Sequence, residues 1–166
     1  MRRLCGVVLL FFCVPALAGE GPDIDSQPVP CTLPEKAFTI CARVTTDGQI
    51  TAARVYFRRE GADFFSFVDM AFGGINYCAT LPAPRAAKAK GVEYYVEAID
   101  QNYEPRRLST FRINVTDVNC EFPPVEKDAA KAAAITVHAT NRKQGRKLDE
   151  AFDSTGVNFI PVAQPK

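Results

Sequence analysis

Apolar and polar residues alternate with a period of two through the middle of the chain. The pattern is clearest in five segments, 38–45, 53–58, 75–81, 92–98 and 111–115. Because successive side chains of a β-strand point to opposite faces, this alternation predicts strands that are buried on one face. Each segment is too short and too strictly alternating for an amphipathic helix.

Turn-forming residues separate these segments at the spacing of β-hairpins. The turns are expected at Asp47-Gly48, 60–63, Gly73-Gly74, 82–84 and 100–102. A strand without a clear inward face is expected at Phe64–Met70, and a short one near Cys31. About seven strands joined in this way predict an all-β fold, an antiparallel sandwich that occupies residues 31–120.

The C-terminal extension, residues 121–166, has a different pattern. A proline-containing linker at 121–125 precedes an alanine-rich stretch, Ala129–Asn141, for which Asp128 is a suitable N-cap. This composition predicts a helix, because alanine has the highest helix propensity. A basic break at 141–147 then leads to an apolar tail.

The apolar tail contains the candidate partner-binding residues of the chain. They are Gly156, Val157, Phe159, Ile160 and Val162. One interpretation is that this segment packs on the sandwich as an added edge strand or a cap, and we favour it because exposed apolar segments are usually buried somewhere. The other is that the segment binds a partner by strand addition.

The N-terminus has the three parts of a cleavable signal peptide, Met1–Ala18. Arg2 and Arg3 supply the positive charge, residues 4–17 carry none, and Ala16 and Ala18 are small residues at the cleavage site. The apolar stretch is short for a membrane anchor. We therefore expect export to the periplasm or the extracellular space, with a flexible leader at residues 19–30.

Removal of the signal leaves 148 residues, which is about one domain. It also removes Arg2 and Arg3, so the formal charge falls from +1 to −1. Such a balance argues against a nucleic-acid-binding protein, which would be clearly basic. No other apolar run is long enough to span a membrane.

Four cysteines remain after cleavage: Cys31, Cys41, Cys78 and Cys120. An even number in an oxidising compartment predicts two disulfides, with three possible connectivities. A zinc site is less favoured, because the chain has no closely spaced cysteine pair and its single histidine, His138, lies far from all four cysteines.

Three of the alternating segments resemble a known kind of module. The runs at 53–59, 75–83 and 92–100 read ARVYFRR, INYCATLPA and VEYYVEAID. In this order they resemble fibronectin type III-like and immunoglobulin-like modules of secreted bacterial proteins. The resemblance covers residues 37–115 and implies a β-sandwich, but such modules have many different functions.

The resemblance also implies a disulfide pairing. In a sandwich of this topology, the strands that carry Cys41 and Cys78 are the second and fifth and lie side by side in one sheet. Facing cysteines on such strands are close enough to bridge. We therefore predict Cys41–Cys78 and Cys31–Cys120, with a Cys31–Cys41 bond as the main alternative.

The sequence contains no recognisable catalytic motif. His138 falls in the predicted helix without an acid pair or a second histidine nearby, so we expect a solvated side chain rather than a catalytic base. No cofactor and no metal are expected. Basic residues at 58–59, 85–90 and 106–107 are interpreted mainly as a solvated charged face.

Several phenylalanines offer a possible aromatic platform for sugars. They are Phe64, Phe65, Phe67 and Phe72, of which we expect at least half to be in the core. The absence of tryptophan weakens this interpretation. We therefore expect an exported non-catalytic binding or structural module whose partner is an unidentified protein or envelope glycan. The alternative is an accessory subunit or inhibitor that docks on an enzyme or surface assembly through its C-terminal tail.

Overall fold

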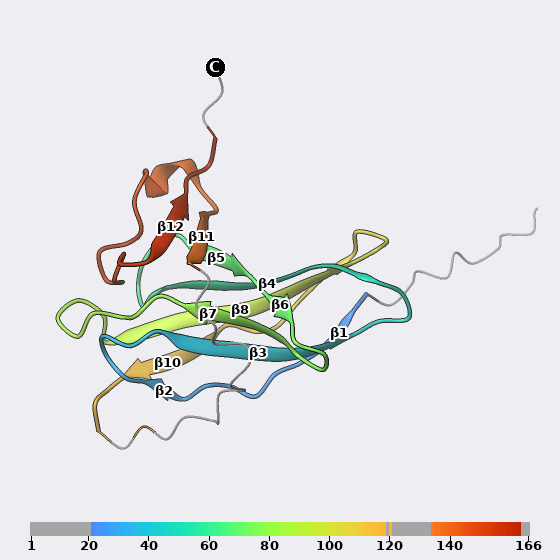
Figure 1. Cartoon of the computed structure of the whole chain (residues 1–166), viewed down its shortest axis with the longest axis horizontal. Helices are drawn as coiled ribbons and strands as arrows, with labels where there is room; N and C mark the ends of the chain where they lie inside the picture. The colour runs from blue at the N-terminus through green and yellow to red at the C-terminus, as the bar shows by residue number, and fades with distance from the viewer. Residues whose placement is uncertain (1–20, 119, 121–133, 164–166) are drawn as a thin grey trace, which may run out of the picture.

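The structure, a computed structural model, describes residues 21–118, 120 and 134–163 (Figure 1). Its elements are β1 (Asp23–Asp25), β2 (Cys31–Thr32), β3 (Phe38–Thr45), β4 (Ile50–Arg59), β5 (Ser66–Asp69), β6 (Ala71–Phe72), β7 (Tyr77–Leu81), β8 (Gly91–Asp100), β9 (Pro105–Arg107), β10 (Phe111–Val115), β11 (Ile135–Ala139), the short 3-10 helix η1 (Arg142–Gln144) and β12 (Val157–Ile160). The described part contains no helix long and apolar enough to cross a membrane. Apart from η1, all elements of the described part are β-strands, as the alternation predicts.

The strands form two sheets. The smaller sheet has the order β1-β3-β7-β6, and the larger has the order β12-β11-β5-β4-β8-β10-β2, with β9 paired to β8. All pairings are antiparallel except β2 with β10 and β11 with β12. In the strand letters used for immunoglobulin domains, the smaller sheet β1-β3-β7-β6 becomes A-B-E-D. The strands β5-β4-β8-β10 of the larger sheet become C′-C-F-G. This is the strand arrangement of an immunoglobulin-like sandwich.

The core lies between the inward faces of the two sheets. Alternate residues of β3 and β7 meet alternate residues of β4, β8 and β10, as expected for a period of two. The large side chains with the least exposure include Ile40, Leu81, Val55, Phe57, Tyr94, Val96 and Ile113. Burial of these side chains is the main favourable contribution to folding, about 1.5–3 kcal/mol for each large apolar residue.

Three expectations about secondary structure need correction. The sandwich does not stop at about seven strands, because ten strands precede residue 118 and two more follow. Part of the segment expected to be a loose leader is ordered: Asp23–Asp25 pairs with β3, and Ile24 and Val29 are buried. The added strands are short: β6 and β9 pair with the neighbouring strands β7 and β8, whereas β1 pairs with β3 and β11 with β5.

The C-terminal helix predicted over Ala129–Asn141 is wrong for its second half. Ile135–Ala139 is strand β11, paired with β5 and β12; residues 129–133 lie outside the described residues. Ile135, Thr136 and Val137 are β-branched and lose rotamer freedom in a helix, whereas they pack well on a sheet. Pairing with two strands outweighs the alanine content of the preceding residues.

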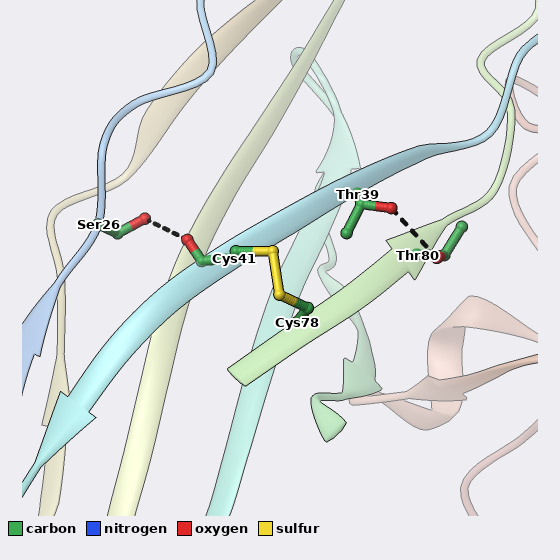
Figure 2. The surroundings of a disulfide bond; sticks show 5 residues. All are labelled: Ser26, Thr39, Cys41, Cys78 and Thr80. Carbon is green, nitrogen blue, oxygen red and sulfur yellow. Dashed lines mark hydrogen bonds between the residues drawn. A yellow bond between two sulfur atoms is a disulfide. The ribbon is translucent and has the colours of Figure 1, made fainter. Parts of the chain in front are cut away.

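Both predicted disulfides are confirmed, and the first joins the centres of two neighbouring strands (Figure 2). Cys41 of β3 lies directly opposite Cys78 of β7, with their Cα atoms 4.2 Å apart. The Thr39 and Thr80 hydroxyls form a hydrogen bond of 3.3 Å on the same pair of strands. The Ser26 hydroxyl donates to the Cys41 carbonyl oxygen, which brings the chain before β2 against β3.

The second disulfide closes the sandwich at its ends. Cys31, at the start of β2, is bonded to Cys120, which follows β10, and their Cα atoms are 5.8 Å apart. β2 also pairs with β10 through Cys31 and Asn114. The bond therefore reinforces the parallel pairing that completes the far edge of the larger sheet.

Loss of either disulfide should destabilise the fold, and loss of Cys31–Cys120 should cost more. It closes a loop of 89 residues against 37 for Cys41–Cys78. In the loop-entropy relation these correspond to about 4.6 and about 3.8 kcal/mol. Denaturant unfolding of the Cys31→Ala/Cys120→Ala and Cys41→Ala/Cys78→Ala proteins measures the difference. The opposite order would mean that the loop-entropy effect does not dominate here.

Candidate functional site

The outer face of the larger sheet, which is turned away from the core, carries a ladder of aromatic rings. His138 on β11, Phe67 on β5, Tyr56 on β4 and Tyr95 on β8 are successive partners across four strands. The ring centroids of Tyr56 and Tyr95 are 4.6 Å apart and the rings are nearly parallel. Phe67 stacks on His138 in the same way, with centroids 4.7 Å apart.

Charged side chains cover the ladder. The guanidinium groups of Arg54, Arg58 and Arg107 lie 4.9, 4.3 and 4.4 Å from the ring centroids of Phe67, Phe65 and Tyr95, respectively. Arg54 also pairs with Asp69 at 3.1 Å, and Arg58 with Glu93 at 2.6 Å. This face is held together by cation–π contacts and ion pairs within the sheet.

The arrangement does not suit sugar binding. A sugar stacks on an exposed ring face, but here the ring faces contact one another or a guanidinium group. The four phenylalanines considered as a possible platform are also dispersed: Phe65 and Phe67 are on this face, Phe64 is near the β4–β5 turn, and Phe72 is on the β6–β7 hairpin. None of the four is fully buried, contrary to expectation.

Tyr56 is the most perturbed titratable group of this face. Burial raises its pKa to about 12, and the hydrogen bond that its hydroxyl donates to Glu97 at 2.9 Å adds to the effect. Both causes disfavour the phenolate, since burial removes its hydration and Glu97 repels it. Tyr56 therefore remains a neutral donor at physiological pH.

His138 is in a different place from the one expected. It lies on β11 and stacks on Phe67, with its Nε2 atom 3.7 Å from a carboxylate oxygen of Asp69. A residue in the predicted helix would not pair with a strand, so the helix prediction did not indicate that His138 lies opposite β5. No group of three metal-binding side chains occurs among the residues that the structure describes.

Residues 134–163, which we call the C-terminal unit, are attached to the sandwich through a buried anchor. Ala151 and Phe152 are buried, and the Phe152 ring meets the edge of the Phe57 ring with centroids 5.1 Å apart. Backbone hydrogen bonds flank this contact, from Arg85 N to Ala151 O and from Asp153 N to Ala83 O, both 2.8 Å. The unit is therefore part of the folded domain.

Ion pairs surround the anchor. Arg85 pairs with Asp153 at 3.2 Å, Lys88 with Glu150 at 2.6 Å, and Arg59 with Asp149 at 3.7 Å. The hydrogen bond from Lys88 lowers the pKa of Glu150, and hydrogen bonds from Thr155 and then Arg85 lower the pKa of Asp153. Much of the basic segment at 85–90 thus faces carboxylates of the same chain.

Three of the candidate partner-binding residues, Val157, Phe159 and Ile160, lie on β12, the outermost strand of the larger sheet; Gly156 precedes this strand and Val162 follows it. Gly156 has a φ of 71° and turns the chain into β12. Val157 and Phe159 lie opposite Ile135 and Val137 and pack against the core, whereas Ile160 lies opposite His138. In Figure 1, β12 and β11 stand beside β5 at one end of the sandwich. The segment thus adopts the favoured arrangement of an added edge strand.

The second edge of β12 is open. Ile135 N donates to Gly156 O at 3.2 Å. In a parallel ladder alternate residues face the same neighbour, so Asn158 and Ile160 also direct their backbone groups to β11. The N–H and C=O of Phe159 then point away from β11, and no described strand pairs with them.

A basic turn lies beside the residues that follow β12. It comprises Arg142, Lys143, Arg146 and Lys147, all exposed, and none of them forms an ion pair within residues 21–118, 120 and 134–163. Gln144 fixes the turn on β5, because its side chain donates to Phe65 O at 3.0 Å and to Ser66 Oγ at 3.1 Å. The backbone that carries these cations is therefore fixed against β5.

Two hollows border the basic turn. The first has a volume of about 270 Å³ and separates the β4–β5 turn from the C-terminal unit; its lining includes Phe57, Arg59, Phe64, Lys147, Phe152 and Phe159. The second lies between Arg142 and Arg146 on one side and Pro161, Val162 and Ala163 on the other. Basic side chains and the end of β12 thus share one surface.

Comparison with known proteins gives no family. No protein-family model and no curated protein matches this chain. Among solved structures, an engineered protein, Northeast Structural Genomics Consortium target OR128, has 15% identity over 57% of this chain, with a TM-score of 0.43. The match spans only 20% of the engineered protein. A chimeric titin Z1Z2 with an exogenous decorin KLER peptide has 20% identity over 60% of this chain and 98% of its own, with a TM-score of 0.36.

Truncation of the anchor should destabilise the whole domain. Phe152 is only 2% exposed and packs on Phe57, so Phe152→Ala should lower the free energy of unfolding by about 3 kcal/mol or more. Urea unfolding provides the measurement. Phe72→Ala is the matched control, because Phe72 is 60% exposed and its loss should change little. Equal effects of the two substitutions would show that Phe152 does not anchor the unit.

Alkaline titration should detect the raised pKa of Tyr56. Between pH 10 and about 12 the unfolded tyrosine ionises while the folded one stays protonated, so this contribution to stability is lost as pH rises through that range. Ultraviolet titration of the folded protein should show a late tyrosinate step, to which Tyr94 and Tyr95 also contribute because burial raises their pKa values. Tyr56→Phe should reduce the amplitude of this step, whereas Tyr103→Phe, at a solvent-exposed position, should retain it. An undiminished late step in Tyr56→Phe would contradict the assignment.

Proposed function

We propose that this protein is an exported, non-catalytic binding module that engages a protein partner through its C-terminal unit. The observation that carries the proposal is the open edge of β12, together with Arg142 and Arg146, which line a hollow with the residues after β12 and have no carboxylate partner in the described structure. A strand edge with unpaired backbone groups is a common route to peptide and protein recognition.

Two features of the chain support export. Disulfides of this kind form and persist in oxidising compartments. The predicted signal at Met1–Ala18, which lies outside the described residues, would deliver the chain there. Periplasmic and extracellular locations agree equally well with both features.

The layout of the surface favours a protein over a glycan as the partner. The aromatic rings of the outer face are stacked on one another and covered by arginines, so they offer little for sugar stacking. The C-terminal unit instead presents a backbone edge, which only another polypeptide can extend. A module that docks in this way also fits the role of an accessory subunit on a larger assembly.

The proposal predicts that two arginines of the basic turn control partner recovery. The mature protein serves as bait in extracts of its native envelope and medium, followed by cross-linking and mass spectrometry. Arg142→Glu/Arg146→Glu should strongly reduce recovery of a specific partner, because opposite charges steer and stabilise the encounter. Lys36→Glu/Arg43→Glu makes the same charge change at exposed positions outside the C-terminal unit and should leave recovery intact.

The same experiment can overturn the proposal. Cross-links that map to the smaller sheet, or equal recovery with both variants, would move the binding surface away from the C-terminal unit. Turnover of any small molecule by the purified protein would contradict the non-catalytic assignment.

A further inference from the structure

We infer that the C-terminal unit recognises an extended, acidic peptide segment, which adds to β12 as a further strand of the larger sheet. This inference rests on the proposed function and names the chemistry of the partner. It brings together three properties of one surface: the open backbone edge of β12, the basic turn, and the apolar residues that follow β12.

The open edge sets the conformation of the ligand. The N–H and C=O of Phe159 face outward, and an extended peptide can satisfy both. Pro161 follows directly and has no N–H, so the ladder cannot continue far in that direction. The backbone pairing is therefore short, and side-chain contacts must provide the rest of the affinity and the selectivity.

The basic turn sets the charge of the ligand. Arg142 and Arg146 line the same hollow as Pro161 and Val162, which places them next to the end of β12. A peptide on the open edge would bring its side chains past this turn. Carboxylates are the complementary groups, and they would form charge-assisted hydrogen bonds with the guanidinium groups.

Apolar residues set the pattern of the ligand. Ile160 is 39% exposed, and Val162 is half-buried. Because neighbouring side chains of an added strand point to opposite faces, alternate residues of the peptide would lie over Ile160 on one face. On the opposite face, Lys147 lines a hollow with Phe159, so the matching ligand alternates β-branched residues with carboxylates.

A second copy of the chain fits this surface less well. The carboxylates closest to β12 in sequence, Asp149, Glu150 and Asp153, already pair with Arg59, Lys88 and Arg85. A copy bound edge to edge would thus bring another basic turn without supplying these carboxylates. A polyanionic glycan would satisfy the charges but would leave the edge of β12 unpaired.

The inference is tested with a labelled synthetic peptide in which valine or threonine alternates with glutamate. Fluorescence anisotropy measures its affinity for the mature protein. Arg142→Glu/Arg146→Glu should weaken binding about tenfold at low salt, and Lys36→Glu/Arg43→Glu should not. A peptide with lysine in place of glutamate should not bind measurably. Equal binding of the two peptides would overturn the charge assignment.

The edge is tested with a matched pair of substitutions at one position. Phe159→Ala and Phe159→Pro both remove the ring, but only proline removes the N–H that points outward. Phe159→Pro should bind the acidic peptide roughly fivefold more weakly than Phe159→Ala. Because Phe159→Pro could disturb β12 itself, hydrogen exchange of the Phe159 amide in the unsubstituted protein is the second measurement. The peptide should slow this exchange, and unchanged exchange would overturn strand addition.

A sulfated polysaccharide and polyglutamate serve as the remaining probes. If both bind as tightly as the alternating peptide and the Phe159 amide is not protected from hydrogen exchange, the surface is a general polyanion site and the inference is overturned. If the peptide does not bind but Arg142→Glu/Arg146→Glu still abolishes recovery of the native partner, only the inferred chemistry of the ligand is rejected. If the peptide does not bind and the substitutions leave recovery unchanged, the proposed function is rejected as well.

Discussion

The contact of Phe152 with Phe57 is the interaction on which the C-terminal unit depends. It places a buried ring from the end of the chain against a core residue of β4. The hydrogen bonds at Ala83 and Arg85 fix the same segment to the connection between β7 and β8. With this segment held, β11 and β12 lie at the edge of the larger sheet without a tryptophan or a third disulfide to secure them.

The charges of the chain are divided between two tasks. Around the anchor, Arg59, Arg85 and Lys88 face Asp149, Glu150 and Asp153, so positive and negative residues from distant parts of the chain select one another. Surface pairs of this kind contribute little stability individually. They do affect where charge is left over: the cations at 142–147 remain a basic group beside the end of β12, although the formal net charge of the whole chain is only +1.

The sequence was sufficient to predict the parts of the fold that depend on local pattern. Alternation at 38–45 and 92–98 identified β3 and β8, because every second side chain of these segments is buried in the core; β8 buries Tyr95 as well. The pairing of Cys41 with Cys78 followed from the resemblance and from their positions on neighbouring strands. The sequence could not show that the end of β12 and the basic turn share one surface, because residues 142–147 and 161–163 come together only through tertiary packing.

The segment around His138 shows why local propensity failed. Ala129–Asn141 is rich in alanine, yet Ile135–Ala139 pairs with β5 on one side and β12 on the other. Helix propensity contributes a few tenths of a kcal/mol per residue, whereas two strand pairings and the burial of Val137 act together. The same competition placed His138 on Phe67 rather than in solvent.

An edge strand must remain accessible to a partner without promoting aggregation. β12 is short, and Pro161 follows its last residue, so its ladder cannot extend into a long flat edge. The exposed cations at 142–147 repel the same turn of another copy. Both features guard the edge against identical chains, and neither hinders a short acidic strand. In the proposed binding mode, the protection of β12 and its selectivity for a ligand thus arise from the same residues.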